Sequence, residues 1–411
     1  MPAESPKQGS EPDPVDRLAP AGDAPLLLVG HQQGLARAVE RLGRPALVLL
    51  ARGRRRPAHP GIVGVREVDL QRDLASVERA ARELLDGRRP AAVVATAERT
   101  VVVAAHLREA FGAPGNSRRT ALACADKVVM KRAMQEHDVP VATWREVTAR
   151  TTAKELVDAL GLPLMLKPRR DSGGRKQRRV TTVEGAERAL AEIAALESGG
   201  YGWLAEGWVE GVEMSVESFV HGGNAIFFNP TEYFVPRHAN ILPAVLRPES
   251  AREIRAFAER AVEAAGVERG ITHVELFRTR RGLVLGELAS RPPGGRLMKL
   301  LARAWGFDPW EALLRIELGE CPTLPTEPRR TSGVWIVHPG AGRLRAIHGV
   351  DTARAVPGVR RVALKAEPGD LVAPREGSGQ DLGAIFADGA DRDAVAASLT
   401  AAHRALRFEL E

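Results

Sequence analysis

The sequence predicts a fold of mixed α/β and α+β class, in which a parallel sheet comes first and antiparallel strands follow. Short apolar runs alternate with helical patterns over residues 25–120, as in parallel sheets that are covered by helices. Two strand patterns then flank a Gly-Gly loop within 161–180, and two more form a hairpin within 271–291. We therefore expect at least two kinds of sheet in one chain.

The N-terminal strands are recognised by their short, uncharged apolar runs. They are PLLLVG at 25–30, PALVLLA at 45–51 and AAVVAT at 91–96. The patterns LARAVERLG, DLASVERAARELLDG and TVVVAAHLREAFG between and after them have the spacing of amphipathic helices. GHQQG, which follows the first strand, is a poor glycine-rich fingerprint, so no dinucleotide site is predicted there.

Composition indicates an ordinary globular protein. The chain has 411 residues, of which 44% are hydrophobic and 27% charged, so it is long enough for two or three domains. No apolar run is long enough to span a membrane. Residues 1–24 are rich in Pro, Asp, Glu and Ser, which predicts a disordered tail rather than a secretory signal. Two cysteines make neither a disulfide framework nor a metal cluster, and we expect a cytoplasmic protein without a membrane partner.

The formal net charge of +7 raises the question of nucleic acid. Most arginines alternate with acids, and only ARGRRR at 51–56 and RRDSGGRKQRR at 169–179 are dense. Aromatic residues make up 4% of the chain, which leaves little for bases to stack on. We expect no nucleic-acid partner.

Lysines and glycines in the next segment indicate an anion site. Lys127 and Lys131 lie one turn apart in a helical pattern that starts near Asp126. Lys167 ends an apolar strand and is followed by the loop 172–174. A lysine there is costly unless an anion meets it, and glycines let backbone amides approach a phosphate. The alternative is an ordinary loop after a strand.

Two glutamates mark the following connection, WLAEGWVEGVEMSVESFV at 203–220. Glu206 and Glu213 lie seven residues apart on either side of a short link between strands. The backbone of such a link can meet an adenine ring, and a carboxylate is a natural partner for ribose hydroxyls. The segment therefore suits a nucleotide.

The hairpin at 271–291 places two acids opposite each other. Counting outward from an expected three-residue loop, Arg280 to Gly282, pairs Glu275 with Glu287 and His273 with Ala289. Opposed like charges destabilise a sheet, whereas a divalent cation between them reverses the sign of that effect. Mg²⁺ takes one or two carboxylates together with phosphates and waters. A surface hairpin with solvated charges is the alternative.

Arg291 adds a guanidinium to the two acids. It lies four residues after Glu287, so it projects toward the same face of the strand. Two acids and one guanidinium in one place suit phosphoryl chemistry.

In chain order, DKVVMK, LMLKPRRDSGG, AEGWVEGVEMSVE, HVELF and GELASRPPGG resemble the nucleotide and metal motifs of the ATP-grasp superfamily of carboxylate-amine ligases. The resemblance implies an ATP-grasp fold with an N-terminal parallel α/β pre-grasp domain, a small lid and a C-terminal domain of antiparallel sheets. The implied parts are a tail at 1–24, the pre-grasp domain at 25–120, the lid at 121–205, the catalytic part at 206–325 and a C-terminal extension at 326–411.

The resemblance also implies ATP and Mg²⁺, with Mn²⁺ as a possible substitute. Its ATP-binding residues would be Lys127, Lys131, Lys167, Ser172, Gly173, Gly174, Glu206, Trp208, Val209 and Glu213. Glu275 and Glu287 would hold the metal, whereas Arg291 and Lys167 would act in catalysis. Which of the two helical lysines contacts phosphate stays open. The dense basic run at 169–179 then becomes a phosphate lid.

The implied reaction is the ATP-dependent joining of a carboxylate and an amine through an acylphosphate, with release of ADP and phosphate. The segment VWIVHPGAGRLRAIHGVDTARAVPGVRRVALKAEPGD resembles the C-terminal region of L-amino-acid ligases and of biotin-carboxylase-like relatives. We therefore expect an amide or peptide bond between amino-acid-like substrates. The alternatives are a carboxylase-like or purine-biosynthetic ligase that uses bicarbonate or formate, and a non-catalytic ATP-binding module.

Substrate residues are expected near the hairpin and in NPTEYFVPRHANILPAVL at 229–246. They are Glu232, Arg237, His238, His273, Gly294 and Gly295, although a polar loop and a packed histidine are the plain alternatives. Ala289 stands where many ATP-grasp enzymes have a metal-binding asparagine, so the second metal position is expected to be weaker or completed by water. The resemblance also suggests a homodimer.

Overall fold

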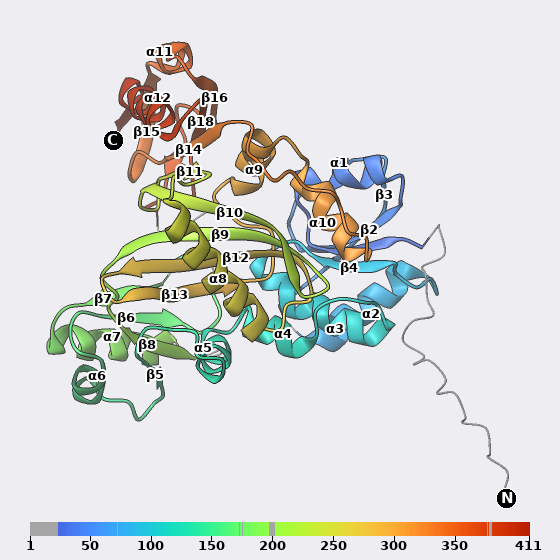
Figure 1. Ribbon diagram of the computed structural model, residues 1–411, viewed down its shortest axis with the longest axis horizontal. Coiled ribbons are helices and arrows are strands. Elements are labelled where there is room, and N and C mark those ends of the chain that lie inside the picture. The colour runs from blue at the N-terminus through green and yellow to red at the C-terminus, as the bar shows by residue number, and fades with distance from the viewer. Residues whose placement is uncertain are drawn as a thin grey trace, which may run out of the picture.

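The computed structural model describes residues 24–71, 73–171, 173–174, 176–196, 202–375, 377 and 380–411. The predicted disordered tail lies outside the described residues, apart from Ala24. Figure 1 shows the N-terminal sheet on one side of a large central sheet, a smaller sheet on the other, and the C-terminal elements above it. Among the described helices, none has the length and apolarity that crossing a membrane requires.

The predicted N-terminal parallel sheet is confirmed. Its order is β3-β2-β1-β4, and its strands are β1 (Leu26–Val29), β2 (Ala46–Ala51), β3 (Ile62–Val68) and β4 (Ala92–Ala95). Leu27 and Val29 of β1 pack with α2 (Leu74–Leu85) and α3 (Val101–Phe111) in one apolar cluster. Leu26 and Leu28 face the other way, toward α1 (Gln33–Leu42) and α10 (Pro309–Glu317). Alternate residues of β1 are thus buried on both faces, as uncharged strands require.

A four-stranded sheet of order β5-β8-β6-β7 follows in the chain. Its elements are β5 (Trp144–Val147), β6 (Leu164–Pro168), β7 (Arg178–Val180) and β8 (Trp203–Gly207), with helices α6 (Ala153–Leu160) and α7 (Val183–Leu196). The strands are antiparallel, and Leu164 and Leu166 point into a core against the two helices. Helices α4 (Arg118–Ala123) and α5 (Lys127–Glu136) connect this sheet to the N-terminal one.

The large sheet has the order β13-β12-β9-β10-β11-β14-β18-β16. Its strands are β9 (Val212–His221), β10 (Asn224–Val235), β11 (Ala239–Leu242), β12 (Arg269–Thr279), β13 (Gly282–Ala289), β14 (Thr331–Val337), β16 (Val359–Leu364) and β18 (Gly383–Gly389). Helix α8 (Pro248–Ala264) packs Ile254, Phe257 and Ala261 on one face. The hairpin strand β12 therefore lies beside β9, which carries Glu213, whereas Glu206 lies on β8 of the four-stranded sheet.

The C-terminal residues join this large sheet and add a small one. Strands β14, β18 and β16 extend the large sheet, whereas β15 (Gly342–His348), β17 (Leu371–Val372) and β19 (Arg407–Leu410) form the order β17-β15-β19. Helices α9 (Leu297–Trp305), α11 (Val350–Ala355) and α12 (Arg392–Ala405) complete the described helices, along with a short 3₁₀ turn, η2 (Glu98–Thr100). The domain bounds given above stay predictions.

The hairpin register is confirmed at the acids and wrong at the loop. Glu275 pairs with Glu287 and His273 with Ala289, as expected, but Thr279 pairs with Gly282, so the loop contains only Arg280 and Arg281. The register shifts between Glu275 and Leu276, where Gly286 is the extra residue of a β-bulge. A Cβ at Gly286 would lie 3.0 Å from the Phe277 ring, so glycine suits this close approach. The bulge restores the pairing that the shorter loop would have displaced.

Candidate functional site

A buried ion cluster joins α5 to the four-stranded sheet. The Glu206 carboxylate of β8 lies 3.1 Å from Lys131 Nζ and 2.6 Å from Lys167 Nζ. The Lys131 side chain is fully buried, and the Lys167 side chain is 15% exposed. Burial opposes ionisation of Glu206, but the two lysines outweigh it and lower the pKa of its carboxyl to about 2. Two of the three lysines that are predicted to bind ATP thus meet at Glu206, which is also predicted to bind ATP.

Local capping places these lysines. Asp126 caps α5 by accepting from Val128 N, and the same carboxylate binds Arg169 at 3.0 Å. Lys127 N donates to Arg169 O, which fixes the first turn of α5 against the end of β6. The sequence therefore brings Lys127, Lys131 and Lys167 together through one buried aspartate.

The two hairpin acids lie across from a third lysine. Lys127 Nζ is 3.3 Å from Glu287 Oε1 and donates to Asp171 O at 3.1 Å. Glu275 Oε1 accepts from Tyr233 OH at 3.2 Å and lies 3.3 Å from His273 Nε2. The phosphate lysines and the predicted metal carboxylates are therefore parts of one site.

The two acids fit Mg²⁺ by the chemistry of their donors. Among the described residues there is no group of three or more His, Cys, Asp and Glu side chains arranged for a metal. Glu275 and Glu287 offer hard oxygens on paired strands, and Mg²⁺ commonly takes its remaining ligands from phosphates and waters. Ala289 is buried opposite His273, so it offers no ligand there.

Arg291 meets an acid from the N-terminal sheet. It lies just beyond β13, and its Nε donates to Glu98 Oε2 at 2.8 Å; the side chains are 13% and 10% exposed. Burial raises the pKa of the Glu98 carboxyl against the opposing charge of Arg291, and Glu287 adds to the rise. Glu98 stands after β4, at the carboxyl end of a parallel strand, where α/β proteins commonly place functional side chains.

A buried polar network that includes Glu217 and His273 fixes the position of the Glu275 carboxylate. Glu217 of β9 is fully buried and accepts from Ser215 Oγ, Asn229 Nδ2 and Thr231 Oγ1. His273 Nδ1 lies 2.9 Å from Glu217 Oε1, so the ring bridges two carboxylates. Burial opposes protonation of the ring, but its hydrogen bonds to Glu217 and Glu275 raise the pKa of His273 to about 9. His273 therefore carries a charge at neutral pH.

This charged histidine predicts a pH dependence of stability in the metal-free protein. Because the folded pKa lies above the unfolded value of about 6.5, the stabilisation is complete below pH ~6.5 and is lost as the pH rises through 9. Urea unfolding should show that His273→Gln costs on the order of 3 kcal/mol at pH 6, and less at pH 9.5. Exposed His137→Gln is the control. A cost for His273→Gln that is the same at both pH values would contradict the bridge.

Glu213, Trp208 and Val209, which are also predicted to bind ATP, lie in or next to the link between β8 and β9. Burial and the nearby Glu275 carboxylate raise the pKa of Glu213 to about 7, while Lys167 opposes that rise. Trp208 N donates to Pro163 O, just before β6, at 3.1 Å, so this backbone amide already has a hydrogen-bond partner within the protein. The Trp208 side chain is exposed, and the Arg179 guanidinium of β7 lies 4.4 Å from the centre of its ring. Val209 follows in the same link.

The structure does not bring every predicted substrate residue to this site. Glu232 alternates with Tyr233 on β10, so it points to the opposite face, where it binds Arg392 of α12 at 2.6 Å and 3.0 Å. Arg237 and His238 lie at the turn between β10 and β11, and Arg375 contacts both. Burial and Arg375 lower the pKa of His238.

The predicted glycines follow two different patterns. Gly173 and Gly174 both have positive φ in the lid loop, whereas Ser172 lies outside the described residues. Gly294 and Gly295 connect Arg291 to α9, and a Cβ on Gly295 would lie 3.3 Å from Asn240 Nδ2.

Three residues of the site, Glu98, Glu217 and Tyr233, were not predicted from the sequence. Glu98 lies 193 residues from Arg291, and Glu217 lies 56 residues from His273. Tyr233 shares a strand with Glu232 and could have been found by alternation along β10. Long-range pairs such as the first two are visible only once the sheets are assembled.

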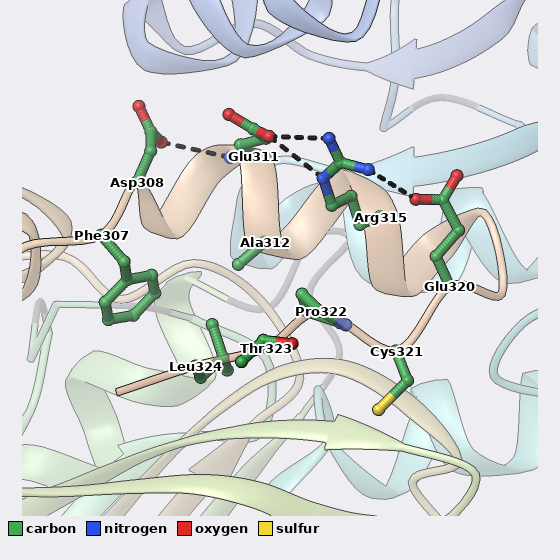
Figure 2. Close-up of a pocket in the computed structure, with 10 residues that line it drawn as sticks. All are labelled: Phe307, Asp308, Glu311, Ala312, Arg315, Glu320, Cys321, Pro322, Thr323 and Leu324. Carbon is green, nitrogen blue, oxygen red and sulfur yellow. Dashed lines mark hydrogen bonds and ion pairs between the residues drawn. The ribbon is translucent and has the colours of Figure 1, made fainter. Parts of the chain in front are cut away.

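A separate pocket of about 360 Å³ lies on α10 and the segment after it (Figure 2). It is lined by Phe307, Asp308, Glu311, Ala312, Arg315, Glu320, Cys321, Pro322, Thr323 and Leu324. Arg315 binds Glu311 and Glu320 across its rim. None of these residues belongs to the ion cluster or the hairpin, so the pocket is not the site described above.

Comparisons with known proteins identify two domain families in the chain. The ATP-grasp domain family matches residues 132–295, and the family of L-amino acid ligase C-terminal domain 2 matches residues 334–411. The L-arginine-specific L-amino acid ligase of Bacillus subtilis is 25% identical over 305 residues, which are 72% of this chain and 74% of that protein.

Two solved structures show the same fold. The L-amino acid ligase from Bacillus licheniformis has a TM-score of 0.83 at 20% identity, over 95% of this chain and 100% of that one. A carboxyaminoimidazole ribonucleotide synthase from Aspergillus clavatus, solved with ATP, has a TM-score of 0.72 at 19% identity, over 93% and 98% of the two chains. The chain therefore contains an ATP-grasp domain at residues 132–295 and a C-terminal domain 2 of the L-amino acid ligase type at residues 334–411.

Proposed function

We propose that the protein joins a carboxylate to the amine of an amino-acid-like substrate, with conversion of ATP to ADP and phosphate through an acylphosphate. The observation that supports this most directly is the convergence of three lysines, two facing carboxylates and the Arg291–Glu98 pair. The similarity to an L-amino acid ligase over most of the chain points to the same class of substrate.

The lysines and the hinge are suited to ATP. Lys127 and Lys167 would neutralise phosphates, whereas Lys131, fully buried beside Glu206, would hold that carboxylate for the adenine amine. Val209 in the hinge would meet the ring, and Glu213 the ribose. The lid glycines 173 and 174 would cover the phosphates with their backbone amides.

Glu275 and Glu287 would hold Mg²⁺, which in such a site neutralises the transferring phosphoryl group. His273 and Tyr233 fix the Glu275 carboxylate through Oε1, and Lys127 contacts Glu287. These three side chains orient the two acids without occupying both oxygens of either in the contacts described.

Arg291 and Glu98 would act on the ligation step. The Arg291 guanidinium is placed to stabilise the oxyanion that forms when the amine attacks. Glu98 holds this guanidinium and, with its raised pKa, is suited to take a proton from the incoming ammonium. Because Glu98 comes from the N-terminal sheet, the amine would bind between that sheet and the hairpin.

The test is ADP release with Mg²⁺ and ATP in the presence of separate pools of amino acids, bicarbonate and formate. We expect stimulation by amino acids, with peptide or amide products identified by mass spectrometry. Stimulation by bicarbonate or formate alone would favour a carboxylase-like or purine-biosynthetic reaction instead. Binding of ATP without stimulation by any pool would mean a non-catalytic module.

A further inference from the structure

A strongly basic surface lies along α9, outside the site described so far. We call it the basic face, and its residues are Arg37, Arg296, Lys299, Arg303, Arg330, Arg360, Arg361 and Lys365. Lys299 and Arg303 lie four residues apart, so they share one side of α9, and Arg296 is the residue that precedes the helix. The opposite side of α9 packs Leu297, Leu300 and Leu301 into the core.

Electrostatics joins the separate segments into one surface. The pKa of Lys299 is lowered by burial and then by Arg296, Arg361, Arg37 and Lys365, which places all four within electrostatic range of its ammonium group. Arg303, Arg330 and Arg360 surround Asp388 at 2.5, 3.6 and 3.5 Å. The face thus combines α1, α9, the segment before β14, and β16.

The acids that pair with these cations lie underneath them. Asp381 binds Arg296 at 3.0 Å and Lys365 at 2.8 Å, and Asp388 is shared by three arginines. These two carboxylates are 6% and 3% exposed, whereas the cations that bind them are 28–53% exposed. An approaching molecule therefore meets positive charge.

The excess of charge is large for this protein. Among the described residues, the ion pairs of these eight cations involve two acids, Asp381 and Asp388, whereas the whole chain has a formal net charge of +7. Like charges held together cost stability unless a counter-charge joins them. Each buried acid would be neutralised by a single cation, yet Asp381 has two cationic partners and Asp388 has three. The additional positive charge is therefore not needed to pair the buried acids.

The basic face begins close to the predicted substrate end of the site, because five residue steps place the Arg291 and Arg296 Cα atoms within about 18 Å of each other. Arg291 of the site and Arg296 of the face are joined by Pro292, Pro293, Gly294 and Gly295. Arg303 lies seven residues after Arg296, the residue that precedes α9, which corresponds to a helical rise of about 10 Å. An extended peptide covers this length with about three residues, whereas a free amino acid does not reach along it.

We propose that one substrate is the end of an acidic peptide, whose terminal residue enters the site beside Arg291 while its following Asp or Glu side chains bind the basic face. This deepens the proposed ligase function and rests on it.

Six of the eight cations are arginines, whose planar forks match carboxylates. Phe386, whose ring lies 6.0 Å from Lys299 Nζ, is buried, so it offers no surface for stacking bases. The face therefore favours carboxylates over nucleic acid.

Binding is tested with labelled hexaglutamate by fluorescence anisotropy, with hexaglutamine as the uncharged counterpart. We expect hexaglutamate to bind, to weaken at high salt, and to bind at least about tenfold more weakly to the charge-reversed variant Lys299→Glu/Arg361→Glu. Arg145→Glu/Arg252→Glu makes the same change in charge at exposed positions of β5 and α8 and should bind as the unchanged protein does.

Turnover is measured with hexaglutamate and with free glutamate. We expect the peptide to stimulate ADP release with a lower KM, and Lys299→Glu/Arg361→Glu to raise the peptide KM about tenfold. The proposal is overturned if hexaglutamine binds equally well or if a single-stranded oligonucleotide binds more tightly than hexaglutamate. It is also overturned if citrate at equal concentration competes fully, or if the peptide binds without stimulating ADP release. If free amino acids stimulate ADP release and the peptide does not, the proposed ligase function stands and only the peptide proposal fails. If none of the substrate pools stimulates ADP release, the ligase function itself is contradicted.

Discussion

Arg291→Ala is expected to lower ligation by about 100- to 1,000-fold while ATP affinity stays nearly unchanged. Removal of a single donor to a developing oxyanion has an effect of this size, about 3 to 4 kcal/mol. Arg291 binds Glu98 at 2.8 Å, whereas the lysines proposed to bind ATP contact Glu206 and Glu287. The measurements are product formation at saturating ATP and ATP affinity by calorimetry.

Arg281→Ala is the matched control, because this arginine is exposed in the loop of the same hairpin. Since Arg291→Ala leaves Glu98 buried without its partner, Arg291→Met/Glu98→Gln serves as a second variant that removes both charges. It should fold and still fail to ligate. A folded variant that loses ATP binding would place Arg291 at the nucleotide and not at the substrate.

Glu206→Ala is expected to destabilise the protein by about 3–5 kcal/mol at neutral pH, because it leaves two lysines of the buried cluster without their carboxylate. The lowered pKa of Glu206, about 2, means that its contribution is present above pH ~4.5 and is lost as the pH falls through 2. Chemical unfolding of the unchanged protein and of the variant should therefore converge in acid.

Asp158→Ala is the control for this cluster. It removes an exposed partner of Lys154, so no measurable change in unfolding is expected. Lys131→Met/Glu206→Gln should recover part of the stability lost in Glu206→Ala, because the fully buried ammonium group is then gone. A loss below 1 kcal/mol in Glu206→Ala would show that the lysines find other partners.

Local patterns in the sequence were sufficient for much of the fold and for the centre of the site. The uncharged strands of the N-terminal sheet, the hairpin and the pairing of Glu275 with Glu287 follow from short periodic segments. The pairing came out right even though the loop is one residue shorter, because the bulge at Gly286 compensates. Neither the loop length nor the bulge can be read separately from an alternating pattern.

The rest depends on contacts between distant segments. Glu98 lies 193 residues before Arg291 in the chain, and Glu217 meets His273 only because β9 and β12 are neighbours. Glu232 has the right chemistry for a substrate ligand but falls on the other face of β10, beside Arg392. The scattered arginines of the basic face likewise come together only after α9 packs against β14 in the large sheet.

The strand order of the large sheet has a further consequence for the C-terminal part of the chain. Ala239 to Leu242 of β11 pair on one side with β10 and on the other with Ser332 to Trp335 of β14. A chain that ended before Thr331 would turn β11 into an open edge, with its amide and carbonyl groups free to add strands of other molecules. The C-terminal residues therefore protect the catalytic sheet from aggregation, so their loss would reduce solubility before it altered the chemistry.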